Sequence, residues 1–282
     1  MRHIPIVLAV LACGCTSAPS TNSPGPSDAA ASPSPDAETD VGRLDAARPS
    51  ADADDANPVD AGSPDASAER PAYCPPPSAG LQEVTGTPAS PYFVHHPSAE
   101  AEATVVFVPG ADGARDIVTD FIWPRWLASG QGVERARVAV PYTTDGDIVD
   151  EGARLVVLAE ELLLCFGGDP TRVHLGGTSN GGLTAFAAML SSGATFASLM
   201  GAPGAFEVPP SDEALRAALL GKRVLLVVGA LDSAVWRNAA RALQQRLVGL
   251  GITATHVELP GEGHILEPGF DATLFYDHWL AP

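Results

Sequence analysis

Basic side chains are scarce in this sequence, and their scarcity bears on the kind of partner that the protein binds. The 282 residues include 16 lysines and arginines but 34 aspartates and glutamates, which gives a formal net charge of −18 at pH 7. Binding to the phosphates of a nucleic acid requires a surface rich in lysine and arginine. No stretch of the sequence forms such a basic patch, so we expect no nucleic-acid partner.

The apolar run at the start of the sequence is too short to span a bilayer as a helix. Residues 4–12 fit instead the hydrophobic region of a secretory signal peptide. Ala12 followed by Cys13 resembles the lipobox of bacterial lipoproteins, in which the cysteine carries the lipid, and Cys15 is the second candidate. We therefore expect residues 1–15 to direct export and a lipid anchor to hold the protein in the cell envelope. An ordinary cleaved signal without lipid, which leaves the protein secreted, is the alternative.

Aromatic residues are missing altogether from residues 16–71, and large aliphatic residues are few there. This stretch is composed mainly of Ala, Ser, Pro, Asp, Gly and Thr, with eleven acids against three arginines. Such a composition cannot bury enough apolar surface to offset the entropy lost on ordering the backbone. We expect a disordered, self-repelling tether that leads to one folded domain at residues 72–282.

Cysteine is also rare, with four in the whole chain, two of them in the signal region. The other two are Cys74 and Cys165. In an exported protein these two can form a disulfide. It would close a loop of about 90 residues and contribute about 4 kcal/mol in the chain-entropy model. Two free buried thiols are the alternative.

The folded region alternates between short apolar runs and helix-like segments. Continuous runs rich in β-branched residues are typical of strands that are covered on both faces, as in a parallel sheet. We predict strands at 92–96, 103–110, 136–143, 172–177, 196–201, 223–230 and 255–261, and helices at 147–166, 181–192, 211–220 and 233–251. This order predicts an α/β protein, a three-layer α/β/α sandwich around a mostly parallel sheet. Only about twenty residues connect the strand ending at 201 to the strand starting at 223, which leaves no room for a large lid domain.

A serine between glycines lies at one junction of strand and helix. The residues Gly177-Thr178-Ser179-Asn180-Gly181 follow the predicted strand 172–177 and begin the predicted helix. This context matches the nucleophile elbow, in which a sharp turn exposes the serine and glycines let strand and helix approach closely. A serine hydroxyl needs a positioned base and a third group that orients the base. Ser179 is therefore the candidate nucleophile.

An acid and a histidine follow in the order that this motif requires. Asp232 comes directly after the strand 223–230, and His264 lies in a glycine-rich loop after the next strand. Capping of the following helix is the alternative role for Asp232. The other candidate bases are less suitable, because His174 and His256 lie within strands, His278 lies near a C-terminal helix end, and His95 and His96 are surface or structural residues. Glu262 and Glu267 flank His264 and are expected to be solvated loop charges.

An enzyme of this kind also needs backbone N–H donors that face the developing oxyanion. We expect one donor from Asn180, directly after the nucleophile. The second should come from the turn "PGADG" after the strand 103–110, where Ala111 is favoured over Asp112. A simple tight turn with Gly113 at positive φ is the alternative reading of the same residues.

The segments "GGDPTRVHLGGTSNGG", "GALDSAV" and "GEGH" together resemble the α/β-hydrolase family, over roughly residue 81 to the C-terminus. More narrowly, they resemble secreted enzymes like polyhydroxybutyrate depolymerases and feruloyl esterases. The resemblance implies hydrolysis of carboxylic esters without a metal or organic cofactor, by Ser179, Asp232 and His264. Many such enzymes carry His-Gly where this sequence has Pro109-Gly110.

The sequence thus predicts an exported serine esterase whose open cleft accepts bulky or polymeric esters. A serine peptidase or an acyltransferase that uses the same three residues is one alternative. A non-catalytic lipoprotein that binds a ligand through the hydrolase fold is another.

Overall fold

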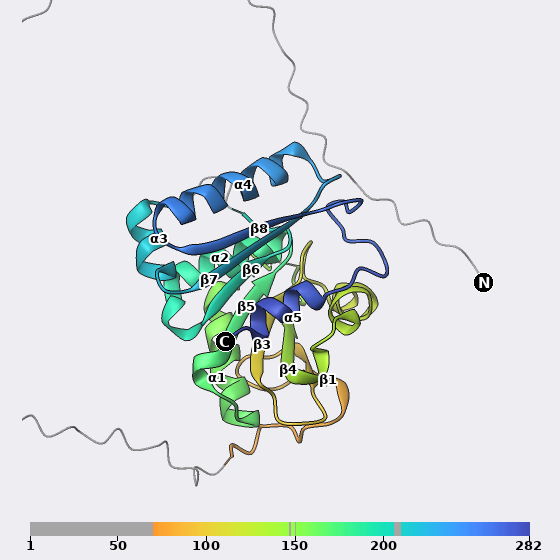
Figure 1. Ribbon diagram of the computed structural model, residues 1–282. Coiled ribbons are helices and arrows are strands. Elements are labelled where there is room, and N and C mark those ends of the chain that lie inside the picture. Colours follow the sequence, from red (N-terminus) through yellow and green to blue (C-terminus); the bar gives the residue numbers. More distant parts are fainter. Residues whose placement is uncertain (1–69, 147, 150, 206–209) are drawn as a thin grey trace, which may run out of the picture. The chain divides into compact units, whose positions relative to one another are not determined.

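A computed structural model describes residues 70–282 except 147, 150 and 206–209. The predicted signal region with Cys13 and Cys15, and all but the end of the predicted tether, lie outside the described residues. The described part contains an eight-stranded sheet in the order β1-β2-β4-β3-β5-β6-β7-β8 (Figure 1). The strands are β1 (Gly80–Val84), β2 (Tyr92–His96), β3 (Ala103–Val108), β4 (Ala136–Pro141), β5 (Val173–Gly177), β6 (Ser198–Gly201), β7 (Arg223–Gly229) and β8 (Thr253–Leu259). Strands β3 to β8 pair in parallel, whereas β1 and β2 add to one edge in antiparallel orientation.

Helices cover both faces of this sheet. The helices α1 (Gly152–Phe166), α2 (Asn180–Ser192), α3 (Asp212–Leu219) and α4 (Ala234–Gly249) pack on one face. The π-helix η1 (Ile117–Trp126) and α5 (Thr273–Leu280) pack on the other face. Short 3-10 helices are found at Leu127–Ser129, Val133–Arg135, Pro170–Arg172 and Gly193–Thr195. None of the helices in the described ranges has both the length and the apolar character needed to cross a membrane.

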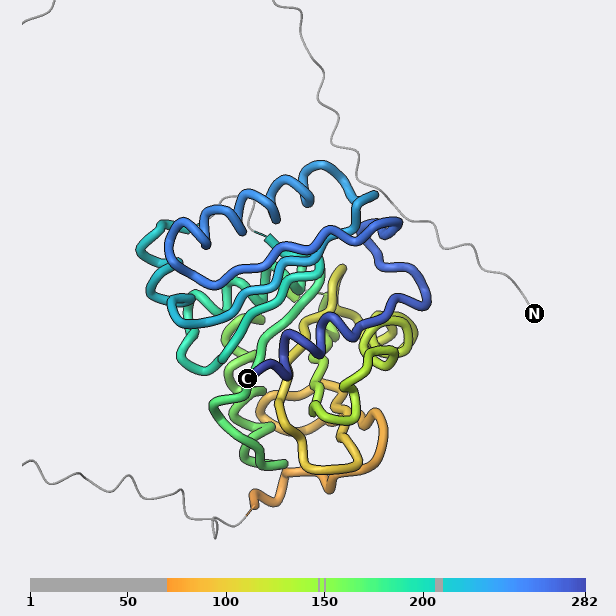
Figure 2. Tube along the Cα trace, viewed as in Figure 1, coloured from red at the N-terminus to blue at the C-terminus, as the bar shows by residue number. Residues whose placement is uncertain are grey.

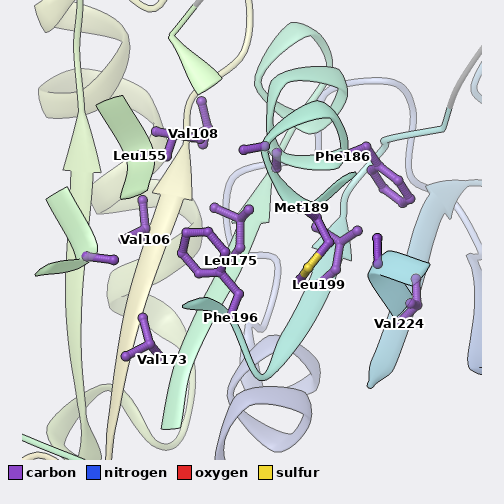
Figure 3. Packing of buried hydrophobic residues seen from close by; sticks show 14 of the residues in the cluster. Val106, Val108, Leu155, Val173, Leu175, Phe186, Met189, Phe196, Leu199 and Val224 are labelled. Carbon is purple, nitrogen blue, oxygen red and sulfur yellow. The ribbon is translucent and has the colours of Figure 1, made fainter. Parts of the chain in front are cut away.

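The central strands have apolar side chains on both faces, and this explains their continuous apolar sequences. In β3, Val106 and Val108 belong to the core beneath α1 and α2, as Figure 3 shows. The intervening Val105 and Phe107 belong to the second core, beneath η1 and α5. Successive side chains of a strand point to opposite faces, so a strand that is buried on both sides has no polar face to alternate with. The predicted three-layer α/β architecture is confirmed.

Three features of the fold differ from the elements that the sequence predicts. The antiparallel strand β1 and the π-helix η1 were not predicted, and the predicted helix 147–166 begins only at Gly152. The carbonyl of Ile148 accepts a hydrogen bond from the Thr184 side chain at 3.0 Å, and the Ile148 side chain is buried. This contact with α2 holds Ile148 in the loop ahead of the helix.

The start of the folded region is fastened to helix α1 at two points. Cys74 and Cys165 form a disulfide with their Cα atoms 5.2 Å apart. Glu161, which is also buried on α1, accepts hydrogen bonds from the Thr87 hydroxyl at 2.6 Å and from the Tyr92 hydroxyl at 2.8 Å. Burial and the neighbouring Glu161 carboxylate raise the pKa of Tyr92 above its usual value, so its hydroxyl stays protonated as a donor.

Candidate active site

The serine singled out in the sequence lies at the turn between β5 and α2, in a strained backbone conformation. Ser179 has φ 53° and ψ −123°, and among the described residues only Ala111 is a second non-glycine residue with positive φ. L-residues seldom adopt such a φ, because it brings Cβ close to the backbone. The turn is tight enough that a Cβ on Gly177 would overlap the carbonyl of Gly181. Only glycine therefore fits at position 177, two residues before the serine. The turn directs the Ser179 side chain away from the sheet.

Three side chains from distant parts of the sequence meet at this turn. The Nε2 atom of His264 lies 3.0 Å from the Ser179 Oγ atom. On the other side of the ring, Nδ1 lies 3.0 Å from one oxygen of Asp232 and 3.2 Å from the other. An ionised carboxylate can only accept hydrogen bonds, so Nδ1 carries the proton and Nε2 presents its lone pair to the hydroxyl. This arrangement suits His264 to remove the proton from Ser179.

The loops that carry Asp232 and His264 are packed directly against each other. A Cβ on Gly229, at the end of β7, would overlap the carbonyl of Gly263. The buried Asp232 also accepts a hydrogen bond from the Ser233 N–H at 2.6 Å. Trp236 on α4 packs against the His264 ring, with 5.1 Å between the ring centroids. Ser233 is the N-cap residue of α4, so Asp232 does not cap that helix, and its carboxylate contacts His264.

Comparison with known proteins supports the fold assignment. No family model matches the chain, and no curated protein matches it significantly. Among solved structures, the esterase of Pseudomonas putida ECU1011 is 15% identical with a TM-score of 0.51, and the match covers 67% of this chain and 76% of the esterase. The TT1662 protein of Thermus thermophilus is 18% identical with a TM-score of 0.52, and the match covers 72% of this chain and 99% of that protein. The chain has the α/β-hydrolase fold.

A third match among solved structures is a puromycin-hydrolysing peptidase of Mycobacterium tuberculosis. It is 15% identical with a TM-score of 0.51, and the match covers 71% of this chain. This chain spans only 39% of the length of that peptidase. At such identities the likeness establishes the fold, and the chemistry has to be inferred from the site itself.

Both N–H groups that were predicted to stabilise an oxyanion lie next to the serine. Asn180 is the first residue of α2, where a backbone N–H has no acceptor within the helix. Ala111, with φ 53°, lies in a turn closed by a 3.0 Å hydrogen bond from the Gly113 N–H to the Gly110 carbonyl. Within the described ranges neither the Ala111 N–H nor the Asn180 N–H has a hydrogen-bond acceptor. As far as the described residues go, both donors are open to a ligand. Gly113, with φ 69°, also completes the tight turn that was the alternative interpretation of the residues "PGADG".

A cavity of about 190 Å³ opens beside the Ser179 hydroxyl. Its lining consists of Gly110, Ala111, Ile117, Phe121, Ile122, Trp126, Thr178, Ser179, His264 and Ile265. The contribution of η1 to this lining was not predicted from the sequence. The density of aromatic and isoleucine residues in "IVTDFIWPRW" was the available signal, but Pro124 inside the segment obscures any regular helical pattern.

The other histidines that were considered as bases lie away from Ser179. The His174 Nδ1 atom lies 2.9 Å from the Ser198 hydroxyl, and burial lowers its pKa to about 3. Burial also lowers the pKa of His278 to about 4 and holds the pKa of His256 below its usual value. These three rings are neutral at physiological pH, and none of them contacts the serine.

The expectation that His95 and His96 could be surface residues is wrong. Both belong to β2 and are buried, at 5% and 8% exposure. His95 packs against Trp123 and His96 against Phe166, so aromatic neighbours on each face of the sheet cover them. Desolvation lowers the pKa of His96 to about 4. They are structural residues, which was the other role expected for them.

The acids that were considered beside Asp232 have local roles. The Glu262 side chain accepts a hydrogen bond from the Glu267 N–H at 2.6 Å, within the loop that carries His264.

Among the residues that the structure describes, no group of three or more His, Cys, Asp or Glu side chains is arranged to hold a metal ion.

Proposed function

We propose that this protein is a serine hydrolase that cleaves carboxylic esters. The observation that supports the proposal most directly is the continuous contact from Asp232 through His264 to Ser179, with both distances at 3.0 Å. Close to this contact lie the backbone N–H groups of Asn180 and Ala111, which have no acceptor among the described residues. Nucleophile, base, orienting acid and oxyanion donors are the parts that acyl transfer requires.

In the proposed reaction His264 takes the Ser179 proton while the serine oxygen attacks the ester carbonyl carbon. The carbonyl oxygen becomes an oxyanion, which accepts hydrogen bonds from the Ala111 and Asn180 N–H groups. When the intermediate collapses, the bond to the alcohol oxygen breaks and His264 gives its proton to the departing alcohol. A water molecule, deprotonated by His264, then attacks the acyl-enzyme. The bond between the acyl carbon and the Ser179 oxygen breaks, the acid leaves, and His264 returns its proton to the Ser179 oxygen.

The setting of this activity is proposed from the sequence alone. The signal-like start, the lipobox-like Cys13 and the acidic residues 16–71 suggest an exported enzyme on a tether, held by a lipid in the cell envelope. From the resemblance of the motifs around Ser179, Asp232 and His264 we infer substrates similar to those of polyhydroxybutyrate-depolymerase-like and feruloyl-esterase-like enzymes.

Labelling with a fluorophosphonate probe tests the proposed chemistry. We expect the folded protein to form one covalent adduct on Ser179, and Ser179→Ala to form none, because only an activated serine attacks the phosphorus. Ser191→Ala, on the same helix, is the matched control and should label like the unchanged protein. Hydrolysis of p-nitrophenyl esters, with p-nitroanilides of the same acids in parallel, then separates esterase from peptidase.

Failure of the folded protein to label would refute the proposal and favour a non-catalytic binding protein. An adduct that persists in Ser179→Ala would also refute it, because another nucleophile would then be responsible. Labelling at Ser179 combined with faster cleavage of the anilides would favour the peptidase alternative.

A further inference from the structure

The walls of the cavity beside Ser179 are built almost entirely from apolar side chains. Ile117, Phe121, Ile122 and Trp126 come from η1, and Ile265 directly follows His264 in the sequence. No side chain that lines the cavity carries a formal charge when His264 is neutral. A charged group placed here would lose its hydration without gaining a partner, whereas an apolar group gains from leaving water.

Contacts between η1 and the loop of His264 hold the lining of the cavity in place. Trp126 is buried, and its Nε1–H donates to the Leu266 carbonyl at 3.2 Å. The Phe121 and Trp126 rings pack edge to face with centroids 5.4 Å apart. Figure 2 shows the chain after β8 passing the coiled segment of η1 before it enters α5. These contacts join η1 to the loop that carries His264. The fold therefore sets the size of the cavity between them.

The His264 side chain itself is partly open to solvent, at 36% exposure. Leu231 and Val235, which flank Asp232 along the chain, are 73% and 64% exposed. The leaving alcohol receives its proton from His264 and must then depart, whereas the acyl group stays attached to Ser179 until water attacks. The apolar cavity therefore suits the acyl group, and the solvent-exposed surroundings of His264 suit the alcohol.

Resting on the proposed hydrolase function, we propose that this cavity is the acyl pocket and takes an uncharged, apolar acyl group of about six to eight carbons. A cavity of about 150 Å³ lined by Leu, Ile and Phe accommodates benzene. The 190 Å³ beside Ser179 is slightly larger, which sets this upper size. Bulky or polymeric substrates are then accommodated through the alcohol portion.

Chain-length profiles measured on variants that enlarge or fill the pocket test this inference. With p-nitrophenyl esters of two to twelve carbons, kcat/KM should rise about fourfold per methylene until the pocket is full and fall beyond eight carbons. Phe121→Ala should move the maximum to longer chains by two or more carbons. Ile117→Trp should lower the rate on the eight-carbon ester at least tenfold relative to the acetate. Leu220→Ala, which is exposed and outside the pocket, is the control and should leave the profile unchanged.

Two results would overturn the acyl pocket while leaving the hydrolase proposal intact. The first is an unchanged profile in both pocket variants, with ester hydrolysis still dependent on Ser179. The second is a shift in the profile for acetate esters of longer alcohols in place of the acyl series. Loss of hydrolysis and labelling in the unchanged protein would instead count against the proposed function itself.

An independent observation concerns the Asn180 side chain. Its Nδ2 donates to the Ala111 carbonyl at 2.9 Å, and Ala111 is held at positive φ. From the other side, the Thr143 hydroxyl donates to the Asp112 carbonyl at 2.8 Å. We infer that Asn180 is a positioning residue that holds the Ala111 N–H toward the oxyanion.

Steady-state kinetics of Asn180→Ala distinguish positioning from a general structural role. We expect kcat to fall about 10- to 100-fold with KM within twofold, because the lost hydrogen bond orients a donor that acts mainly in the transition state. A boronic acid inhibitor should lose affinity by the same factor, and the thermal midpoint should change by less than about 2 °C. Asn238→Ala, exposed on α4, is the matched control. An unchanged kcat, or a loss explained by a lower thermal midpoint, would overturn the inference.

Discussion

Replacing His264 with alanine should lower kcat for ester hydrolysis by about 10⁴- to 10⁶-fold, while the protein stays folded. His264 is the only ring within hydrogen-bond distance of the Ser179 hydroxyl among the described residues. Without it the hydroxyl keeps its proton and the departing alcohol receives none. The residual rate would come from the Ala111 and Asn180 N–H groups alone.

The companion substitution Asp232→Asn should lower kcat by about 10⁴-fold for a different reason. The new amide can donate to the Nδ1 atom of His264, which places the ring proton on Nε2 and removes the lone pair that faces Ser179. Rates on a p-nitrophenyl ester and circular dichroism of each variant provide the measurement. His256→Gln, on β8 and without a contact to Ser179, is the control and should retain kcat within about twofold. A kcat of His264→Ala within tenfold of the unchanged protein would exclude the proposed mechanism.

Replacing Gly181 with alanine should lower the free energy of unfolding by at least about 3 kcal/mol and abolish probe labelling. A Cβ at this position would overlap the backbone carbonyl oxygens of Pro109 and Val108. Backbone atoms cannot rotate away as a side chain does, so β3 and α2 would have to separate. Ser179 directly precedes α2, and Ala111 lies in the turn after β3. The site would therefore be disrupted together with the packing.

Denaturation in urea compares this variant with Gly249→Ala. Gly249 ends α4, and a Cβ there would meet no atom within 4 Å. That control should be stabilised by about 0.5–1 kcal/mol, because alanine loses less backbone entropy than glycine in a helix. Equal stability of the two variants would show that the elbow tolerates a wider separation of strand and helix than its geometry indicates.

Much of the fold follows from patterns that are local in the sequence. The apolar runs at 103–110 and 223–230 correspond to β3 and β7, and the small-residue segment after Ser179 corresponds to α2. Strand β1 was missed because four of its five residues are not fully buried, so it lacks the apolar signal of the central strands. The π-helix η1 was missed because its apolar side chains reach the core through an irregular turn that contains Pro124.

The candidate site was predictable to the extent that it depends on strand order. Ser179, Asp232 and His264 each lie in the segment that follows a parallel strand, and the carboxyl ends of parallel strands share one edge of the sheet. The Trp236 contact with His264 and the Asn180 contact with Ala111 have no such signal. Both depend on the angles at which loops pack, which no spacing in the sequence encodes.

The sequence by itself determined the layer architecture, the order of strands and helices, and the three residues expected to meet. The periodicity of apolar residues and the local composition fix these features, because each feature depends on residues that are near one another along the chain. Only the tertiary structure decided the apolar cavity and the hydrogen bond from Asn180 to the Ala111 turn. These arise from contacts between residues such as Trp126 and Leu266 that are 140 positions apart, and their geometry is set by packing the whole domain at once.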